Sequence, residues 1–251
     1  MLVQKDSNEL YHQSPGISAS GLKTIYKKSI YHYLNQKPFE SSAMAFGSAV
    51  HCAMLEPDDF YKEYHVMPKL DRRTKEGKSE YEDQKQKASG KILLNNDDFK
   101  KIEKILVNFR NHDLAQKFCK GDIEYSHYTK CDDIEVRVRP DVLNKVGNFI
   151  CDVKTCQDNS PMAFKRDVYK YAYHLQAAFY MDMLGINDWR FVAVQNTYPY
   201  TVEVYALSEE LIEQGRVAWK KAFSDYKLYI ECGIVSGYNW NEFKEDGSLV
   251  I

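Results

Sequence analysis

The sequence lacks the features that mark secreted, membrane-spanning or zinc-ribbon proteins. Its six cysteines form no C-x-x-C pair, so their spacing indicates neither a zinc ribbon nor a disulfide framework. No apolar run approaches the roughly 18 to 20 residues that cross a bilayer, and the N-terminal stretch lacks the apolar segment of a secretory signal. We therefore expect a cytoplasmic protein without a membrane partner, whose thiols are reduced and in several cases buried.

A strong charge of one sign is also absent. The formal net charge is −2, which argues against a surface that is basic all over but says nothing about a local basic cleft. Repeats, low-complexity tracts and clear linkers are missing, and 44% of the residues are hydrophobic, enough for a substantial core. These properties predict a single domain over residues 1–251, with a charged surface excursion near 69–91.

Hydrophobic spacing divides the chain into helices and strands. Helices are expected over 18–36, 43–57, 161–184 and 208–232, and another begins at residue 96 or 97 with apolar positions up to Phe109. Strands are expected near 122–130, 133–143, 148–155, 189–196 and 201–207. This order predicts an α/β fold in which helices flank a mixed central sheet.

The string RVRPDVLNKVGNFICDVKT, residues 137–155, reads as a hairpin that carries charge at its centre. A turn at Val146-Gly147 would place Asp141 opposite Asp152, with Cβ atoms about 4.5 to 5.5 Å apart. The two-residue side-chain period puts Phe149, Cys151 and Val153 on an apolar face of the second strand, and Ile150, Asp152 and Lys154 on the opposite face. Facing carboxylates require either a proton or a cation, and hard oxygen ligands suit Mg²⁺ or Mn²⁺. The alternative is a surface hairpin whose charges face solvent.

Pro140-Asp141, then ten residues, then Asp152-Val153-Lys154 resembles the signature of the PD-(D/E)XK nuclease superfamily. More specific strings occur in the same order as in the RecE-type (exonuclease VIII) family: SASGLK, GSAVHCAMLEPDDF, RVRPDVL, ICDVKTCQDNSPMAFKRDV and YAYHLQAAFYMDML. RecB-type nuclease domains and lambda exonuclease are more distant relatives. The resemblance covers roughly residues 14 to 230 and implies a restriction-endonuclease-like (PD-(D/E)XK) core.

The resemblance also implies a metal site. His51 would bind the metal together with Asp141, Asp152 and the backbone carbonyl of Val153, while Lys154 would position the attacking water. Glu124, in DIEYSHY, matches a glutamate that the family tends to carry on the strand before the hairpin. The alternatives are a core histidine for His51 and a solvated strand residue for Glu124.

Further residues resemble the substrate contacts of the family. Gln176 and Tyr180 lie one helical turn apart and match a Gln-Tyr pair that contacts substrate and lysine. Ser18, Ser20 and Lys23 would sit at a helix N-terminus, where free N–H groups favour a phosphate. A core tyrosine and simple helix capping are the alternatives.

The family pattern implies a Mg²⁺-dependent DNA exonuclease, with Mn²⁺ able to substitute. Its substrate would be an end of linear double-stranded DNA, degraded from the 5′ end to leave 3′ single strands for a RecT-like annealing partner. Its relatives are ring-shaped, so a ring-shaped homo-oligomer is expected, in which each subunit presents a local basic strip such as Lys23, Lys27 and Lys28 to the enclosed duplex. The alternatives are a catalytically inactive DNA-binding or scaffold module of the same fold and an end-independent endonuclease. An iron–sulfur nuclease is disfavoured, because only Cys232 follows Cys156.

Overall fold

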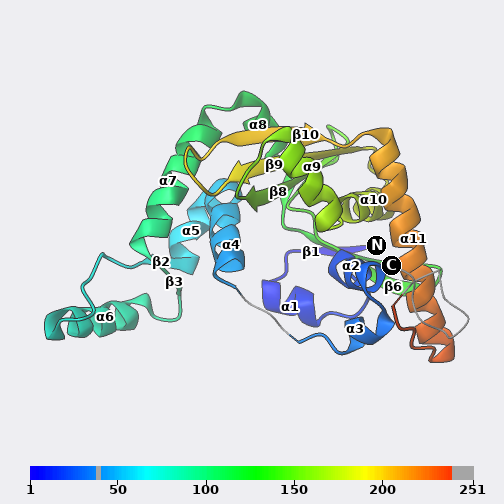
Figure 1. Cartoon of the computed structure of the whole chain (residues 1–251), viewed down its shortest axis with the longest axis horizontal. Coiled ribbons are helices and arrows are strands. Elements are labelled where there is room, and N and C mark those ends of the chain that lie inside the picture. The colour runs from blue at the N-terminus through cyan, green and yellow to red at the C-terminus, as the bar shows by residue number, and fades with distance from the viewer. Residues whose placement is uncertain (38–40, 239–251) are drawn as a thin grey trace, which may run out of the picture.

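A mixed five-stranded sheet forms the centre of the fold (Figure 1). The computed structural model describes residues 1–37 and 41–238. The strands lie in the order β10 (Val202–Ala206), β9 (Asp188–Gln195), β8 (Phe149–Cys156), β7 (Val142–Asn144) and β4 (Asp122–Ile123). β8 and β9 are parallel and the other neighbours antiparallel. The expected restriction-endonuclease-like α/β fold is thus confirmed.

Helices cover both faces of this sheet, and the side-chain alternation along β8 assigns each face its own core. Phe149, Cys151 and Val153 pack against α4 (Ser42–Leu55), α5 (Pro57–Glu63), α7 (Asn96–Arg110) and α8 (Asp113–Phe118). Ile150 lies in the second core with α2 (Ala19–Lys27), α9 (Pro161–Lys170), α10 (Tyr173–Leu184) and α11 (Glu209–Cys232). The predicted division of β8 into an apolar face and a face with Ile150, Asp152 and Lys154 agrees with this arrangement.

Two predicted strands are each divided between the central sheet and a second, three-stranded sheet. The second sheet contains β1 (Leu2–Gln4), β5 (Ser126–Cys131) and β6 (Ile134–Val138). The strand predicted over 122–130 breaks at Glu124, whose φ of 56° leaves the extended region. The strand predicted over 133–143 breaks at Pro140, which has no N–H for a sheet ladder. The predicted continuous strands were wrong at these two points.

Two predicted helices are also divided. The helix expected over 18–36 is α2 followed by α3 (Ile30–Leu34), because the Ser29 side chain accepts a hydrogen bond from the His32 backbone N–H and caps a new helix. The helix expected over 161–184 breaks at Ala172, where φ is +50°, and continues as α10. The helix predicted to begin at residue 96 or 97 and the helix predicted over 208–232 are confirmed as α7 and α11.

The charged excursion contains a helix that its composition did not reveal. α6 (Lys75–Ala88) is capped by Thr74 and stands apart from the main body in Figure 1. The parallel strands β2 (Tyr64–Val66) and β3 (Ile92–Leu94) flank it, and α1 (Asn8–Gln13) follows β1 at the start of the chain.

The cysteines are free, as expected, and Cys52, Cys151 and Cys156 are buried. Among the described residues, no helix is both long and apolar enough to span a membrane.

Candidate metal and hydrolytic site

Three acidic residues form a row across β4, β7 and β8. Ile123 pairs with Val142, and Val142 pairs with Cys151. Because these pairs are antiparallel, the following row of the sheet places Glu124 across from Asp141 and Asp141 across from Asp152. The Glu124 backbone N–H donates a hydrogen bond to the Asp141 carbonyl at 3.2 Å. The register confirms the predicted position of Asp141 across from Asp152, with a turn centred on 146–147.

His51 approaches this row from α4. Its Nδ1 lies 3.4 Å from Oδ2 of Asp141, and its Nε2 lies 2.7 Å from the carbonyl oxygen of Val153. Asp141 also accepts a hydrogen bond from the Val153 N–H at 2.7 Å. One ligand atom each from His51, Glu124 and Asp141 lie within 4.8 Å of one another. The structure therefore gathers three of the five predicted ligand groups around one point.

The donor set at this point fits a divalent cation. A hydrogen bond to the Val153 carbonyl requires the proton on Nε2 of His51, so in the neutral ring the Nδ1 lone pair faces the Asp141 carboxylate. Two acceptors in contact need a proton or a cation between them. A nitrogen and carboxylate oxygens are ligands that Mg²⁺, Mn²⁺ and similar divalent ions accept.

The surroundings of Glu124 are also short of positive charge. Burial and the charge of Asp141 raise the pKa of Glu124 to about 8, although Arg139 opposes the shift. Nε of Arg139 lies 3.0 Å from Oε2 of Glu124. One guanidinium therefore compensates only part of the negative charge of this row.

Asp152 lies on the same row but has different partners. It is 1% exposed, its Oδ2 forms an ion pair with Nζ of Lys154 at 2.5 Å, and its Oδ1 accepts from Nε2 of Gln176 at 2.7 Å. Burial and the charge of Asp141 raise the pKa of Asp152 against the effect of Lys154. Burial lowers the pKa of Lys154, but the charges of Asp152 and Asp141 outweigh burial and raise this pKa above its ordinary value. The Asp152 carboxylate thus holds Lys154 and Gln176, and its predicted role as a metal ligand stays a prediction.

Lys23 lies inside this network rather than on an exposed strip. Its Nζ donates to Oε1 of Gln176 at 2.9 Å. Burial and the charge of Lys154 lower the pKa of Lys23 to about 8. Ser18 and Ser20 lie at the start of α2, where the Ser18 side chain accepts from the Gly21 N–H and caps the helix. Within the described residues, no contact joins either serine to the acidic row.

Tyr180 lies behind the site in the apolar core. It is 6% exposed, and its ring centroid is 6.0 Å from that of Trp189. Burial raises the pKa of its hydroxyl, and the Arg139 backbone is a hydrogen-bonding neighbour. Gln176, one turn earlier on α10, makes the polar contacts described above.

Tyr173 is a site residue that the sequence reasoning missed. Its ring centroid lies 5.0 Å from Nζ of Lys154 and 5.7 Å from Nζ of Lys23. It therefore packs against both amines that approach Asp152. Its position three residues before Gln176 on the same helix was the available signal, since residues three apart share a helix face.

Comparison with known proteins places this chain in a family. A family model described as "PDDEXK-like domain of unknown function (DUF3799)" matches residues 18–232. The chain belongs to this PDDEXK-like family. Its membership confirms the PD-(D/E)XK superfamily expected from the Pro140-Asp141 and Asp152-Val153-Lys154 strings and supports a nuclease.

Two solved structures are similar to the chain. A candidate exonuclease from Eubacterium rectale is 13% identical, with 94% of this chain and 90% of that chain covered and a TM-score of 0.61. A phage-related exonuclease from Haemophilus somnus 129PT is 12% identical, with 88% and 98% covered and a TM-score of 0.39. The first of these likenesses shows the shared fold. No curated protein matches the chain in sequence.

Proposed function

We propose that the chain is a Mg²⁺-dependent DNA exonuclease of the RecE type that hydrolyses linear double-stranded DNA from the 5′ end. One observation carries this proposal: Glu124, Asp141 and Asp152 form a row with a histidine at one side and a lysine at the other. Mn²⁺ is expected to substitute, because it accepts the same ligands as Mg²⁺.

Different residues of the site would have different roles in phosphodiester hydrolysis. His51, Glu124 and Asp141 would hold the cation, with the Val153 carbonyl beside them. When bound, the cation supplies Lewis acidity, which neutralises phosphate charge and acidifies a water molecule. Lys154 stays charged at neutral pH and would orient the attacking water or a phosphate oxygen, while Asp152 fixes the lysine in place.

A nucleotide-release assay tests the proposal. Linear duplex labelled at one 5′ end or one 3′ end is incubated with and without Mg²⁺, and the products are resolved over time. We expect Mg²⁺-dependent release that starts at the 5′ label and leaves a 3′ single strand. The Asp141→Asn variant, purified in the same way, is the control for contaminating nuclease. Absence of release by the unaltered protein in Mg²⁺ and Mn²⁺ would favour the inactive DNA-binding module.

We also propose that the protein acts as a ring-shaped homo-oligomer that passes single strands to a RecT-like annealing protein. The net charge of −2 supports enclosure, since one subunit of this charge would hold DNA weakly at physiological salt. A closed ring should digest linear duplex over long distances and leave covalently closed circles intact. Light scattering measures the oligomer, and rapid cutting of circles would instead favour the end-independent endonuclease.

A further inference from the structure

A basic groove lies beside the hydrolytic site, along α2, α3 and the turn before α10. It has a volume of about 560 Å³ and is lined by Ser20, Lys23, Thr24, Lys27, Lys28, Tyr31, His32, Asn35, Gln36, Lys37 and Tyr171. Four of these residues are lysines and none is acidic. On a chain whose net charge is −2, this is a local excess of positive charge.

Aromatic and amine contacts connect the groove to the hydrolytic site. Tyr171 lies in the groove, and its ring centroid is 5.5 Å from that of Tyr173, which packs against Lys154. Lys23 lines the groove and donates to Gln176, which in turn donates to Asp152. The Nζ of Lys27 donates to the Lys170 carbonyl at 2.6 Å and ties α2 to the end of α9. The groove is therefore an extension of the site and is held by defined contacts.

The groove also offers exposed aromatic rings. Tyr31 is 58% exposed and Tyr171 is 42% exposed. Basic grooves with accessible aromatic side chains bind single-stranded nucleic acid, because lysines meet phosphates and rings stack on bases. The volume lies in the range of small-ligand sites, about 300 to 1,000 Å³, which suits a few nucleotide units of one strand rather than a duplex.

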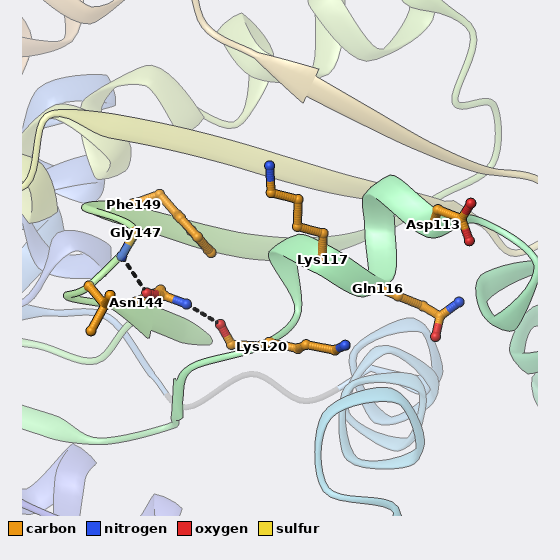
Figure 2. Close-up of a pocket in the computed structure, with 8 residues that line it drawn as sticks. Asp113, Gln116, Lys117, Lys120, Asn144, Gly147 and Phe149 are labelled. Atoms are coloured by element: carbon orange, nitrogen blue, oxygen red, sulfur yellow. Dashed lines mark hydrogen bonds between the residues drawn. The ribbon is translucent and has the colours of Figure 1, made fainter.

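A hollow at another edge of the protein provides a comparison (Figure 2). It has a volume of about 520 Å³ and is lined by Asp113, Gln116, Lys117, Lys120, Asn144, Val146, Gly147 and Phe149. It also contains two lysines, but it includes an acidic residue, and its one aromatic ring, Phe149, is buried. The basic groove therefore differs from this hollow less in its volume than in its lining residues. Its lining contains no acidic residue and includes the exposed rings of Tyr31 and Tyr171.

We propose that the basic groove holds a single strand of DNA next to the scissile phosphate, with Lys28 and Lys37 at its phosphates and Tyr31 and Tyr171 against its bases. This inference rests on the proposed function, since it takes DNA as the substrate. It differs from the sequence prediction of a Lys23, Lys27 and Lys28 strip around a duplex, because Lys23 is directed to Gln176.

Binding of a fluorescein-labelled oligothymidylate, measured by anisotropy in EDTA so that nothing is hydrolysed, tests the proposal. The Lys28→Gln/Lys37→Gln double variant should bind about tenfold more weakly at low salt, with the slope of log affinity against log salt reduced by about 1.4. Tyr171→Ala should weaken binding without changing that slope, because stacking releases no counterions. Lys117→Gln/Lys120→Gln removes the same charge from the hollow of Figure 2 and should leave binding unchanged.

Three outcomes would each overturn the proposal that the groove binds a single strand. The two double variants could lose the same affinity for the oligothymidylate, or Tyr171→Ala could bind it normally. The Lys28→Gln/Lys37→Gln variant could also lose as much affinity for a blunt duplex as for the oligothymidylate. Thermal unfolding of every variant checks that the fold persists, as expected for exposed side chains. Groove-dependent binding by a protein that hydrolyses no DNA would support the groove and refute the proposed function. Hydrolysis of DNA without any binding of the oligothymidylate would do the reverse.

Discussion

The two ends of the acidic row are built differently. At one end, Glu124 and Asp141 lie beside His51, and Arg139 forms an ion pair with Glu124. At the other end, Asp152 is approached by Lys154 directly and by Lys23 through Gln176. The first end lacks positive charge, whereas the second has an excess of it. The first is therefore suited to a cation and the second to a phosphate.

This difference can be tested by removing charge from each end in turn. Removal of a carboxylate from the first end should relieve repulsion, so the fold should tolerate it while catalysis is lost. Removal of the Lys154 charge from the second end should leave the buried Asp152 carboxylate uncompensated, so stability should fall as well. The predictions below follow this contrast.

Asp141→Asn should have the largest effect on activity. We expect cleavage in Mg²⁺ to fall at least about a thousandfold, because the cation loses a charged ligand next to Glu124. Stability without metal should be unchanged or higher, since the variant removes the Asp141 charge, which adds to burial in raising the pKa of Glu124. Nuclease rates and thermal unfolding in EDTA measure the two effects. The control Asp188→Asn alters a carboxylate of β9 that pairs with Arg190. Near-normal cleavage by Asp141→Asn would show that the metal site is elsewhere.

Lys154→Met should abolish turnover while leaving Mn²⁺ binding measurable by calorimetry. Lysine is not a ligand here, and methionine keeps an apolar stem beside Tyr173. Unlike Asp141→Asn, this variant leaves the Asp152 charge buried and unpaired, so stability should fall by about 3 kcal/mol. The double variant Asp152→Asn/Lys154→Met should regain most of that stability and none of the activity. Loss of Mn²⁺ binding in proportion to activity would place the lysine in the metal site.

His51→Ala should weaken the apparent affinity for Mg²⁺ about tenfold or more and reduce the rate, with a smaller effect on unfolding. Its side chain is 25% exposed and lies at the cation-poor end of the row. His127→Ala is the matched control, because His127 is 1% exposed on β5 and should affect the fold alone. If His51→Ala unfolds the protein while the folded fraction keeps its Mg²⁺ dependence, His51 is a core residue.

The acidic row was predictable because strand periodicity and turn position fix which side chains face each other. The assignment of Asp141 and Asp152 to opposing positions needed only the hairpin turn and the two-residue period. Periodicity does not report which sheet a strand joins, so the breaks at Glu124 and Pro140 were missed, although the proline was a usable signal. Lys23 and Gln176 are 153 residues apart in sequence, and helical spacing gives no information about such a contact. The same holds for Tyr173, which acquires its role from packing.

The titration of Lys23 should change how stability depends on pH. Lys23 has a pKa of about 8 in the folded chain, against 10.5 for an ordinary lysine. Between these values the unfolded chain holds the extra proton, so the unaltered protein gains stability as pH rises from about 8 to 10.5. Below pH 8 both states are protonated, and the cost of burying the charge, at most about 3 kcal/mol, is fully present.

Relative to Lys23→Met, the unaltered protein should therefore become progressively more stable between about pH 8 and 10.5. The lost hydrogen bond to Gln176 adds a constant offset and no slope. Lys23→Arg keeps its proton throughout, so the difference between the arginine and methionine variants should stay flat. Denaturant unfolding at intervals from pH 7 to 10.5 measures the free energy of unfolding of each variant. If the difference in this free energy between Lys23→Met and the unaltered protein does not change with pH, the Lys23 amine is solvated rather than buried beside Gln176.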